Sequence, residues 1–276
     1  FSLSLDQPDV LVGVIIGASV VFFFSGLAIM AVGRAAGRVV LEVREQFRTR
    51  PGIMDGTEKP EYARVVDICT KDSLRELVTP GLLAVLAPIA VGFALGYAPL
   101  GAFLGGAIAA GVLMAVFLAN SGGAWDNAKK LVEDGHHGGK GSEAHEATVI
   151  GDTVGDPFKD TAGPAINPLL KVMNLVALIV APSVVIYADN VALRVGVTVI
   201  AVVVLVGAVL WSKRRGGGTE TRLAEIGDRS TPKGTPEQGI GGTSPAEGAS
   251  SDGNAGEKDV ADSGDRKEEA RTGEGK

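Results

Sequence analysis

Charged side chains that could do chemistry gather in two short stretches, residues 120–130 and 151–171. In the second stretch polar residues recur every three or four positions, so one face of one helix would carry three carboxylates, an amide and two amines. This stretch runs directly into an apolar segment, where charge is costly, and a whole stripe of charge there indicates a functional site. The stripe comprises Asp152, Asp156, Lys159, Asp160, Gly163, Asn167 and Lys171.

The first stretch places Asp126 ahead of Lys129 and Lys130, and we expect it at the same membrane face as the stripe. Gathered aspartates repel one another, and lysines offset only part of that repulsion. Mg²⁺ would offset the rest, because it takes oxygen ligands and shares the phosphate oxygens of a substrate. Lysines beside it suit a phosphate. The pattern therefore predicts a phosphoryl-transfer site, with one carboxylate holding the attacking water.

Two structural explanations compete with this chemistry. Asp126 with Lys129 and Lys130 is also the pattern of an ordinary ion pair at a helix end. Asp156 followed by Pro157 is also the pattern of a helix N-cap followed by proline at the first helical position.

The composition indicates a protein that crosses the membrane several times. Hydrophobic residues make up 46% of the 276 positions, with 39 glycines. The single Cys69 excludes an internal disulfide and a cysteine-cluster metal site, and we expect no nucleic-acid partner. We predict an all-α membrane protein in which residues 1–211 form a bundle of five transmembrane helices, since each span needs about 20 apolar residues. The predicted spans are 10–33, 76–96, 99–125, 164–188 and 191–211.

Basic residues predict the orientation of these spans. Loops 34–75 and 129–149 and the exit at 213–215 carry Lys and Arg, whereas connections 97–100 and 187–190 carry none. We therefore place the site and the C-terminal tail in the cytoplasm. Residues 212–276 are predicted to be a disordered tail, because they have too few large apolar residues to form a core. Gly101 and Gly105 match a GxxxG pattern, which fits close helix packing.

Several segments resemble the membrane-bound, ion-pumping inorganic pyrophosphatases. The resemblance covers about residues 10–188 and implies an α-helical homodimer with about sixteen or seventeen membrane helices per protomer. It also implies Mg²⁺-dependent hydrolysis of pyrophosphate coupled to export of H⁺ or Na⁺ from the cytoplasm. The segments are Ala31–Ala36, Glu42–Phe47, Pro60–Leu77, Gly122–Lys130 and Gly151–Lys171.

The resemblance implies roles for individual residues. Asp126, Asp156 and Asp160 match carboxylates that bind magnesium pyrophosphate. Lys129 and Lys159 match lysines that contact the substrate, and they are predicted to be catalytic together with Asp160. Asp160 also matches one of two aspartates that hold the nucleophilic water.

Three further residues, Lys171, Asp152 and Arg34, match charged positions of the family. Lys171 matches a lysine in the ion gate, about 17 Å along the helix from Asp160 at 1.5 Å per residue. Asp152, Arg34 and Lys130 are predicted to support the site.

Parts of the family pattern are missing from this sequence. The earlier acidic loop with most of the magnesium ligands is absent, as are the acidic residues of the gate. We therefore expect the chain to be the C-terminal portion of a longer protein and to be inactive alone. The pumped ion is predicted to be H⁺ because most of the family pumps protons. The alternatives are a Na⁺-pumping pyrophosphatase and a secondary transporter for an anion, in which Lys171 and the aspartates would line a pathway.

Overall fold

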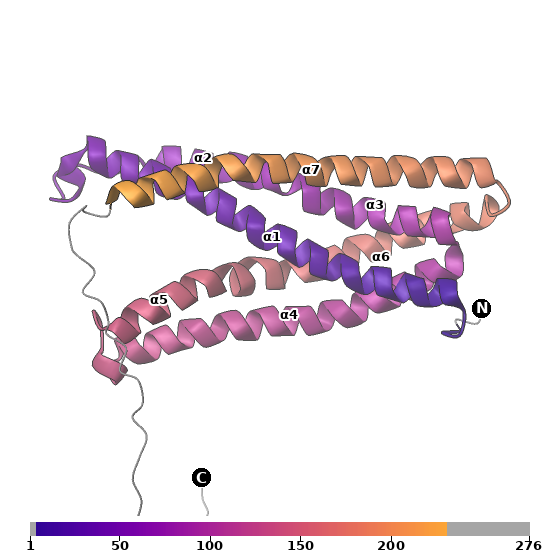
Figure 1. Cartoon of the computed structure of the whole chain (residues 1–276), viewed down its shortest axis with the longest axis horizontal. Coiled ribbons are helices and arrows are strands. Elements are labelled where there is room, and N and C mark those ends of the chain that lie inside the picture. The colour runs from indigo at the N-terminus through magenta and orange to yellow at the C-terminus, as the bar shows by residue number, and fades with distance from the viewer. Residues whose placement is uncertain (1–3, 231–276) are drawn as a thin grey trace, which may run out of the picture. The chain divides into compact units, whose positions relative to one another are not determined.

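Every regular element of the described chain is a helix. The structure is a computed structural model that describes residues 4–230, with side chains described to residue 214. In this range five stretches are long and apolar enough to cross a membrane, which confirms the predicted all-α bundle (Figure 1). The elements are α1 (Pro8–Thr49), η1 (Pro51–Ile53), α2 (Tyr62–Glu76), α3 (Val78–Leu95), α4 (Tyr97–Glu133), η2 (His136–Gly138), α5 (Glu143–Asp156), η3 (Pro157–Ala162), α6 (Gly163–Ile186) and α7 (Val191–Ser230).

Three of the five spanning stretches extend well beyond their apolar segments. Helix α1 continues to Thr49 and α4 to Glu133, so both carry charged residues past the apolar part. Helices α5 and α6 are joined by η3 without a loop, and together they run from Glu143 to Ile186. The charged stripe therefore lies on a helical rod that is continuous with a membrane span.

A single glycine turns the chain between α3 and α4. Gly96 ends α3 and begins α4 with φ of 105°, a backbone conformation that side chains with a Cβ rarely adopt. Because the turn is this short, α3 and α4 leave it as direct neighbours.

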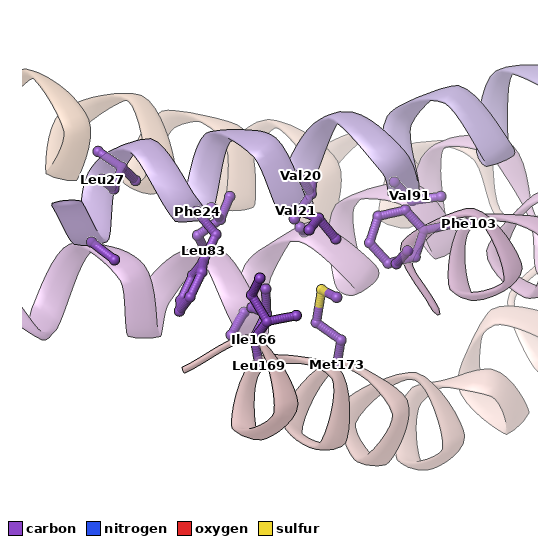
Figure 2. Packing of buried hydrophobic residues seen from close by; sticks show 14 of the residues in the cluster. Val20, Val21, Phe24, Leu27, Leu83, Val91, Phe103, Ile166, Leu169 and Met173 are labelled. Atoms are coloured by element: carbon purple, nitrogen blue, oxygen red, sulfur yellow. The ribbon is translucent and has the colours of Figure 1, made fainter. Parts of the chain in front are cut away.

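The core lies between α1, α3, α4 and α6. Phe103 of α4, Val21 of α1 and Met173 of α6 are completely buried and belong to one apolar cluster. Figure 2 shows side chains of this cluster meeting from helices that are far apart in the sequence. The cluster holds α4 and α6 together.

Helices α1 and α4 approach backbone to backbone through glycines. A Cβ at Gly17 would overlap the carbonyl oxygen of Phe103, and one at Gly106 would overlap that of Val14. The packing interpretation of the GxxxG match needs correction, because a Cβ at Gly105 would meet no atom within 4 Å. The glycine in the contact is one position further along the helix.

Helix α7 packs along α3 and also contacts α1. Its start is fixed by Asn190, whose side-chain oxygen accepts from the backbone N–H of Leu193 at 3.0 Å. Arg194 then donates to the carbonyl oxygens of Phe93 and Ala94 at the end of α3, each at 2.9 Å. The helix continues past residue 211 to Ser230, and residues 231–276 of the predicted tail lie outside the described residues.

The packing of Phe103 gives a first prediction. In this chain purified in detergent, Phe103→Ala should lower the free energy of unfolding by about 3–5 kcal/mol, because it opens a cavity in the core. Phe117 lies on the same helix and is 60% exposed, so Phe117→Ala should cost far less. Thermal unfolding followed by circular dichroism makes the comparison, and equal losses would contradict this assignment of the core.

Candidate functional site

Charged side chains from α4, α5 and η3 meet around the ammonium group of Lys159. Its Nζ lies 2.9 Å from Oδ2 of Asp126 and 3.0 Å from Oδ1 of Asp156. Oδ1 of Asp152 lies 3.4 Å from the same nitrogen, and the other oxygen of Asp152 pairs with Lys129. We call this set the α4–α5 cluster, and its members are Asp126, Lys129, Lys130, Asp152, Asp156 and Lys159.

The cluster balances its own charge. Lys130 completes it with an ion pair of 3.1 Å to Oδ2 of Asp126, so three lysines face three aspartates. Within these six side chains the lysines therefore offset all of the carboxylate charge. Burial decreases across the cluster, because the side chain of Asp152 is 8% exposed and that of Asp156 is 50% exposed. One end of the cluster is held inside the helix pair and the other is open to solvent.

The connection between α4 and α5 brings their charged faces together. Ser142 caps α5 by accepting from the backbone N–H of His145 at 3.1 Å. The His145 ring also lies 3.3 Å from Glu133, which ties the start of α5 to the end of α4. The two helices then run side by side (Figure 1).

A π-helical segment, η3, supplies Lys159 and Asp160, and sequence reasoning missed it. Pro157 begins the segment, and Pro164 follows its end. Since proline has no N–H, neither can donate the hydrogen bond that keeps an α-helix in register, which permits the wider π turn. The two Pro positions were the available signal, and π turns are frequent at functional sites.

The ion pairs shift pKa values in the cluster, whose residues lie outside the apolar segments 99–125 and 164–188. Hydrogen bonds from Lys159 and then Lys130 lower the pKa of Asp126. A hydrogen bond from Lys129 lowers the pKa of Asp152 despite its burial. The bond to Asp126 raises the pKa of Lys159 above that of an ordinary lysine. Asp126, Asp152 and Lys159 are therefore charged at neutral pH.

The donor set fits a magnesium ion that is shared with a substrate. Among residues 4–214 no three His, Cys, Asp or Glu side chains come close enough to form a metal site by themselves. Mg²⁺, however, commonly takes one or two carboxylates and completes its shell with water and substrate phosphate oxygens. Asp126 and Asp156, which approach the same point from two helices, offer such a pair of carboxylates.

Three other predicted site residues form no ion pair with the cluster. Asp160 is exposed on η3 and makes no ion pair with any residue that the structure describes. Lys171 is exposed on α6, also without an ion pair in the described part of the chain. Arg34 instead binds Glu76, with 2.5 Å between guanidinium and carboxylate, and donates to Ser212 of α7.

Arg34 belongs to a second buried ionic network that sequence reasoning did not identify. Arg38, one turn further along α1, pairs with Asp72 at 2.8 Å and with Glu76 at 3.3 Å. The signal was present, because two arginines spaced by four face two acids spaced by four. This network fixes α2 against α1 and connects both to α7.

Comparison with known proteins relates the chain to one family. The model of a family described as inorganic H⁺ pyrophosphatase matches residues 1–180. A K(+)-insensitive pyrophosphate-energized proton pump of Streptomyces avermitilis is 73% identical over 218 residues, which is 78% of this chain and 27% of that protein. A pump of the same description from Chloroflexus aurantiacus is 54% identical over 225 residues, 82% of this chain and 28% of that protein.

The similarity also extends to a relative with a different ion in its name. A putative K(+)-stimulated pyrophosphate-energized sodium pump of Bacteroides thetaiotaomicron is 52% identical over 181 residues, 66% of this chain and 25% of that protein. This chain therefore spans about a quarter of the length of the curated relatives that it matches.

The pairing of Asp126 gives a prediction about pH. Asp126→Asn should lower the thermal unfolding midpoint of the purified chain at pH 6, because the amide no longer neutralises Lys159 and Lys130. Since folding lowers the pKa of Asp126, its contribution is present above the ordinary value of 3.8 and is lost as pH falls through the lowered value. The difference between the two proteins should fade below that pH.

The matched control is Asp189→Asn, which changes an exposed aspartate in the turn between α6 and α7. It should leave the thermal unfolding midpoint unchanged both at pH 6 and below the lowered pKa of Asp126. An Asp126→Asn protein as stable as wild type at pH 6 would contradict the assigned ion pairs.

Proposed function

Because the chain belongs to the inorganic H⁺ pyrophosphatase family, we propose that the whole protein hydrolyses pyrophosphate and uses the energy to move protons across the membrane. The chain supplies one part of the catalytic site and one part of the ion path. The observation that carries this proposal is the α4–α5 cluster, in which lysines and aspartates from two helices meet at a solvent-open end.

Lys129 and Lys159 are the proposed phosphate ligands. Both point their ammonium groups at carboxylates of the cluster, so both can exchange those carboxylates for phosphate oxygens of similar geometry. Pyrophosphate carries several negative charges, and two positioned ammonium groups would stabilise the additional charge that builds on its oxygens during cleavage. Lys130, which is 61% exposed, supports the site by neutralising Asp126.

Asp126 and Asp156, with Asp160, are the proposed magnesium ligands. Bound Mg²⁺ would supply charge neutralisation at the phosphate oxygens. Asp126 and Asp156 are already held toward one point by their shared contact with Lys159. Asp152 is the most buried of the cluster carboxylates and bonds both lysines, so its role is to orient them.

Asp160 is the proposed holder of the attacking water. Its carboxylate makes no ion pair within the described residues, and it is exposed one position after Lys159. A carboxylate that a metal does not fully occupy can accept a proton from water as the oxygen attacks phosphorus. Water then adds to one phosphorus, the bridging P–O bond breaks, and two phosphates leave without a covalent enzyme intermediate.

The ion path is proposed to pass Lys171 on α6. A charge within an apolar span calls for a partner, and Lys171 has none in the part of the chain that the structure describes. We propose that a carboxylate from another part of the whole protein pairs with it. The basic loops support a cytoplasmic position for the cluster, and the homodimer that the family resemblance implies belongs to this proposal as well.

The proposed ion is H⁺, and the proposed activity is independent of K⁺. Support comes from the relatives with 73% and 72% identity, both named K(+)-insensitive proton pumps, whereas the relative named a sodium pump is 52% identical.

Hydrolysis tests the first half of the proposal. Membranes containing the whole protein should release phosphate from pyrophosphate, and the release should stop when a chelator removes Mg²⁺. Asp156→Asn should reduce the rate on the order of 100-fold, the typical effect of losing one electrostatic contact to a transition state. Asp134→Asn, at the exposed end of α4, should retain full activity. Full activity of the Asp156 variant would contradict the metal role.

Ion movement tests the second half. Inverted membrane vesicles given pyrophosphate in buffer free of Na⁺ and K⁺ should acidify inside, as quenching of a pH-sensitive acridine dye reports. A protonophore should abolish the quenching while hydrolysis continues. In a separate assay with ²²Na⁺ added, pyrophosphate-driven uptake of ²²Na⁺ that persists with the protonophore would show a sodium pump instead.

A further inference from the structure

The helices that carry the α4–α5 cluster cross at a point where neither has a side chain. A Cβ at Gly122 of α4 would lie 2.5 Å from the carbonyl oxygen of Gly155 and 3.0 Å from the backbone nitrogen of Lys159. It would also lie 2.8 Å from Cβ of Lys159. Real side-chain carbons do not approach backbone atoms so closely, so any residue other than glycine at position 122 must displace the neighbouring helix.

The same contact is less tight when viewed from the other helix. A Cβ at Gly155 would lie 3.1 Å from the Cα and from the carbonyl oxygen of Gly122. That distance is short but can be relieved by a small shift. The two glycines therefore differ in how strictly the crossing excludes a side chain.

The crossing directly adjoins the residues that make the ionic contacts. Asp126 is one helical turn after Gly122, and Asp156 follows Gly155 in the chain. Lys159, which bonds both aspartates, is itself one of the residues that touch the position of a Gly122 side chain. A change in helix separation at the crossing is thus passed to the cluster with no flexible segment in between.

A second close contact supports the same face one turn away. The indole ring of Trp125 covers Gly151 so closely that a Cβ at position 151 would overlap the ring. Trp125 and Gly151 each directly precede an aspartate of the cluster, Asp126 and Asp152. The charged residues are therefore bordered by contacts that tolerate no added atom.

We infer that Gly122 and Gly155 are positioning residues, which set the separation of α4 and α5 so that Lys159 reaches carboxylates on both helices. As a statement about catalysis, the inference rests on the proposed function. The ion pairs of Lys159 with Asp126 and Asp156 are at ordinary hydrogen-bond distance, 2.9 and 3.0 Å, so a larger separation of the helices would weaken them. A displacement of about 1 Å in an active site can cost on the order of 100-fold in rate.

The chain contains a matched control in the next residue. A Cβ at Gly123 would meet no atom within 4 Å. Replacing Gly122 or Gly123 by alanine removes the same backbone flexibility and gives the same gain in helix propensity. Only the Gly122 variant adds an atom to the crossing, so the difference between the two variants reports the contact alone.

Kinetics of the whole protein in membranes give the first test. Gly122→Ala should lower kcat and kcat/KM for magnesium pyrophosphate about 10- to 100-fold, because the misplaced groups act on the transition state. Gly155→Ala should have a smaller effect, and Gly123→Ala should stay within about twofold of wild type. If Gly122→Ala and Gly123→Ala have equal kinetics, or if Gly122→Ala raises KM alone, the inference is wrong.

A second test needs no activity. The purified whole protein, free of metal and substrate, is treated with acetic anhydride, and mass spectrometry compares acetylation of Lys159 with that of Lys130. The Lys159 side chain is 18% exposed and bound by carboxylates, whereas that of Lys130 is 61% exposed. Gly122→Ala should raise the relative labelling of Lys159 severalfold, and Gly123→Ala should not change it.

The two tests separate the two proposals. Wild-type protein without pyrophosphatase activity overturns the proposed function, and the labelling comparison still decides whether Gly122 sets the helix separation. If Gly122→Ala does not fold, Gly155→Ala takes its place, since its closest contact of 3.1 Å forces a smaller shift of the neighbouring helix and should raise the labelling of Lys159 by a smaller factor. Unchanged labelling of Lys159 in the folded variant overturns the inference.

Discussion

The contact of one ammonium group with carboxylates from two helices is the interaction on which the site depends. Lys159 reaches Asp126 of α4 and Asp156 of α5 at nearly equal distances, 2.9 and 3.0 Å. Without a cation between them these carboxylates would repel, and the charged ends of α4 and α5 could not lie together. In the proposed function a metal would replace the ammonium at these carboxylates, and the ammonium would bind phosphate oxygens instead.

The rest of the fold fixes where those groups stand. The apolar cluster of Phe103, Ile166 and Met173 joins α4 to α6 within the apolar part of the bundle. The glycine crossing joins α4 to α5 closer to the charges. Between these contacts lies the π-helical segment, the one described stretch of the rod from Glu143 to Ile186 that departs from α-helical geometry.

The sequence predicted the elements better than the contacts between them. Long apolar runs identified the five spanning stretches, because a helix needs only its own residues to satisfy its backbone in lipid. The two charged stretches identified Asp126, Lys129, Asp156 and Lys159, which the structure brings together. Contacts set by the rotation of one helix against another were not predictable. The sequence pattern therefore assigned Gly105 to a helix contact, whereas the glycine that packs against α1 is Gly106. The π turn and the pairing of Arg34 with Glu76 were missed although the sequence carries a signal for each, in the two prolines and in the charged residues spaced by four.

We propose that the α4–α5 cluster exchanges its internal ion pairs for magnesium and pyrophosphate. An electron cryo-microscopy structure of the whole protein with Mg²⁺ and the non-hydrolysable analogue imidodiphosphate tests it most directly. Phosphate oxygens should lie within hydrogen-bond distance of Nζ of Lys129 and Lys159, with Asp126 and Asp156 on the metal. Analogue bound elsewhere, with Lys159 still paired to both aspartates, would contradict it.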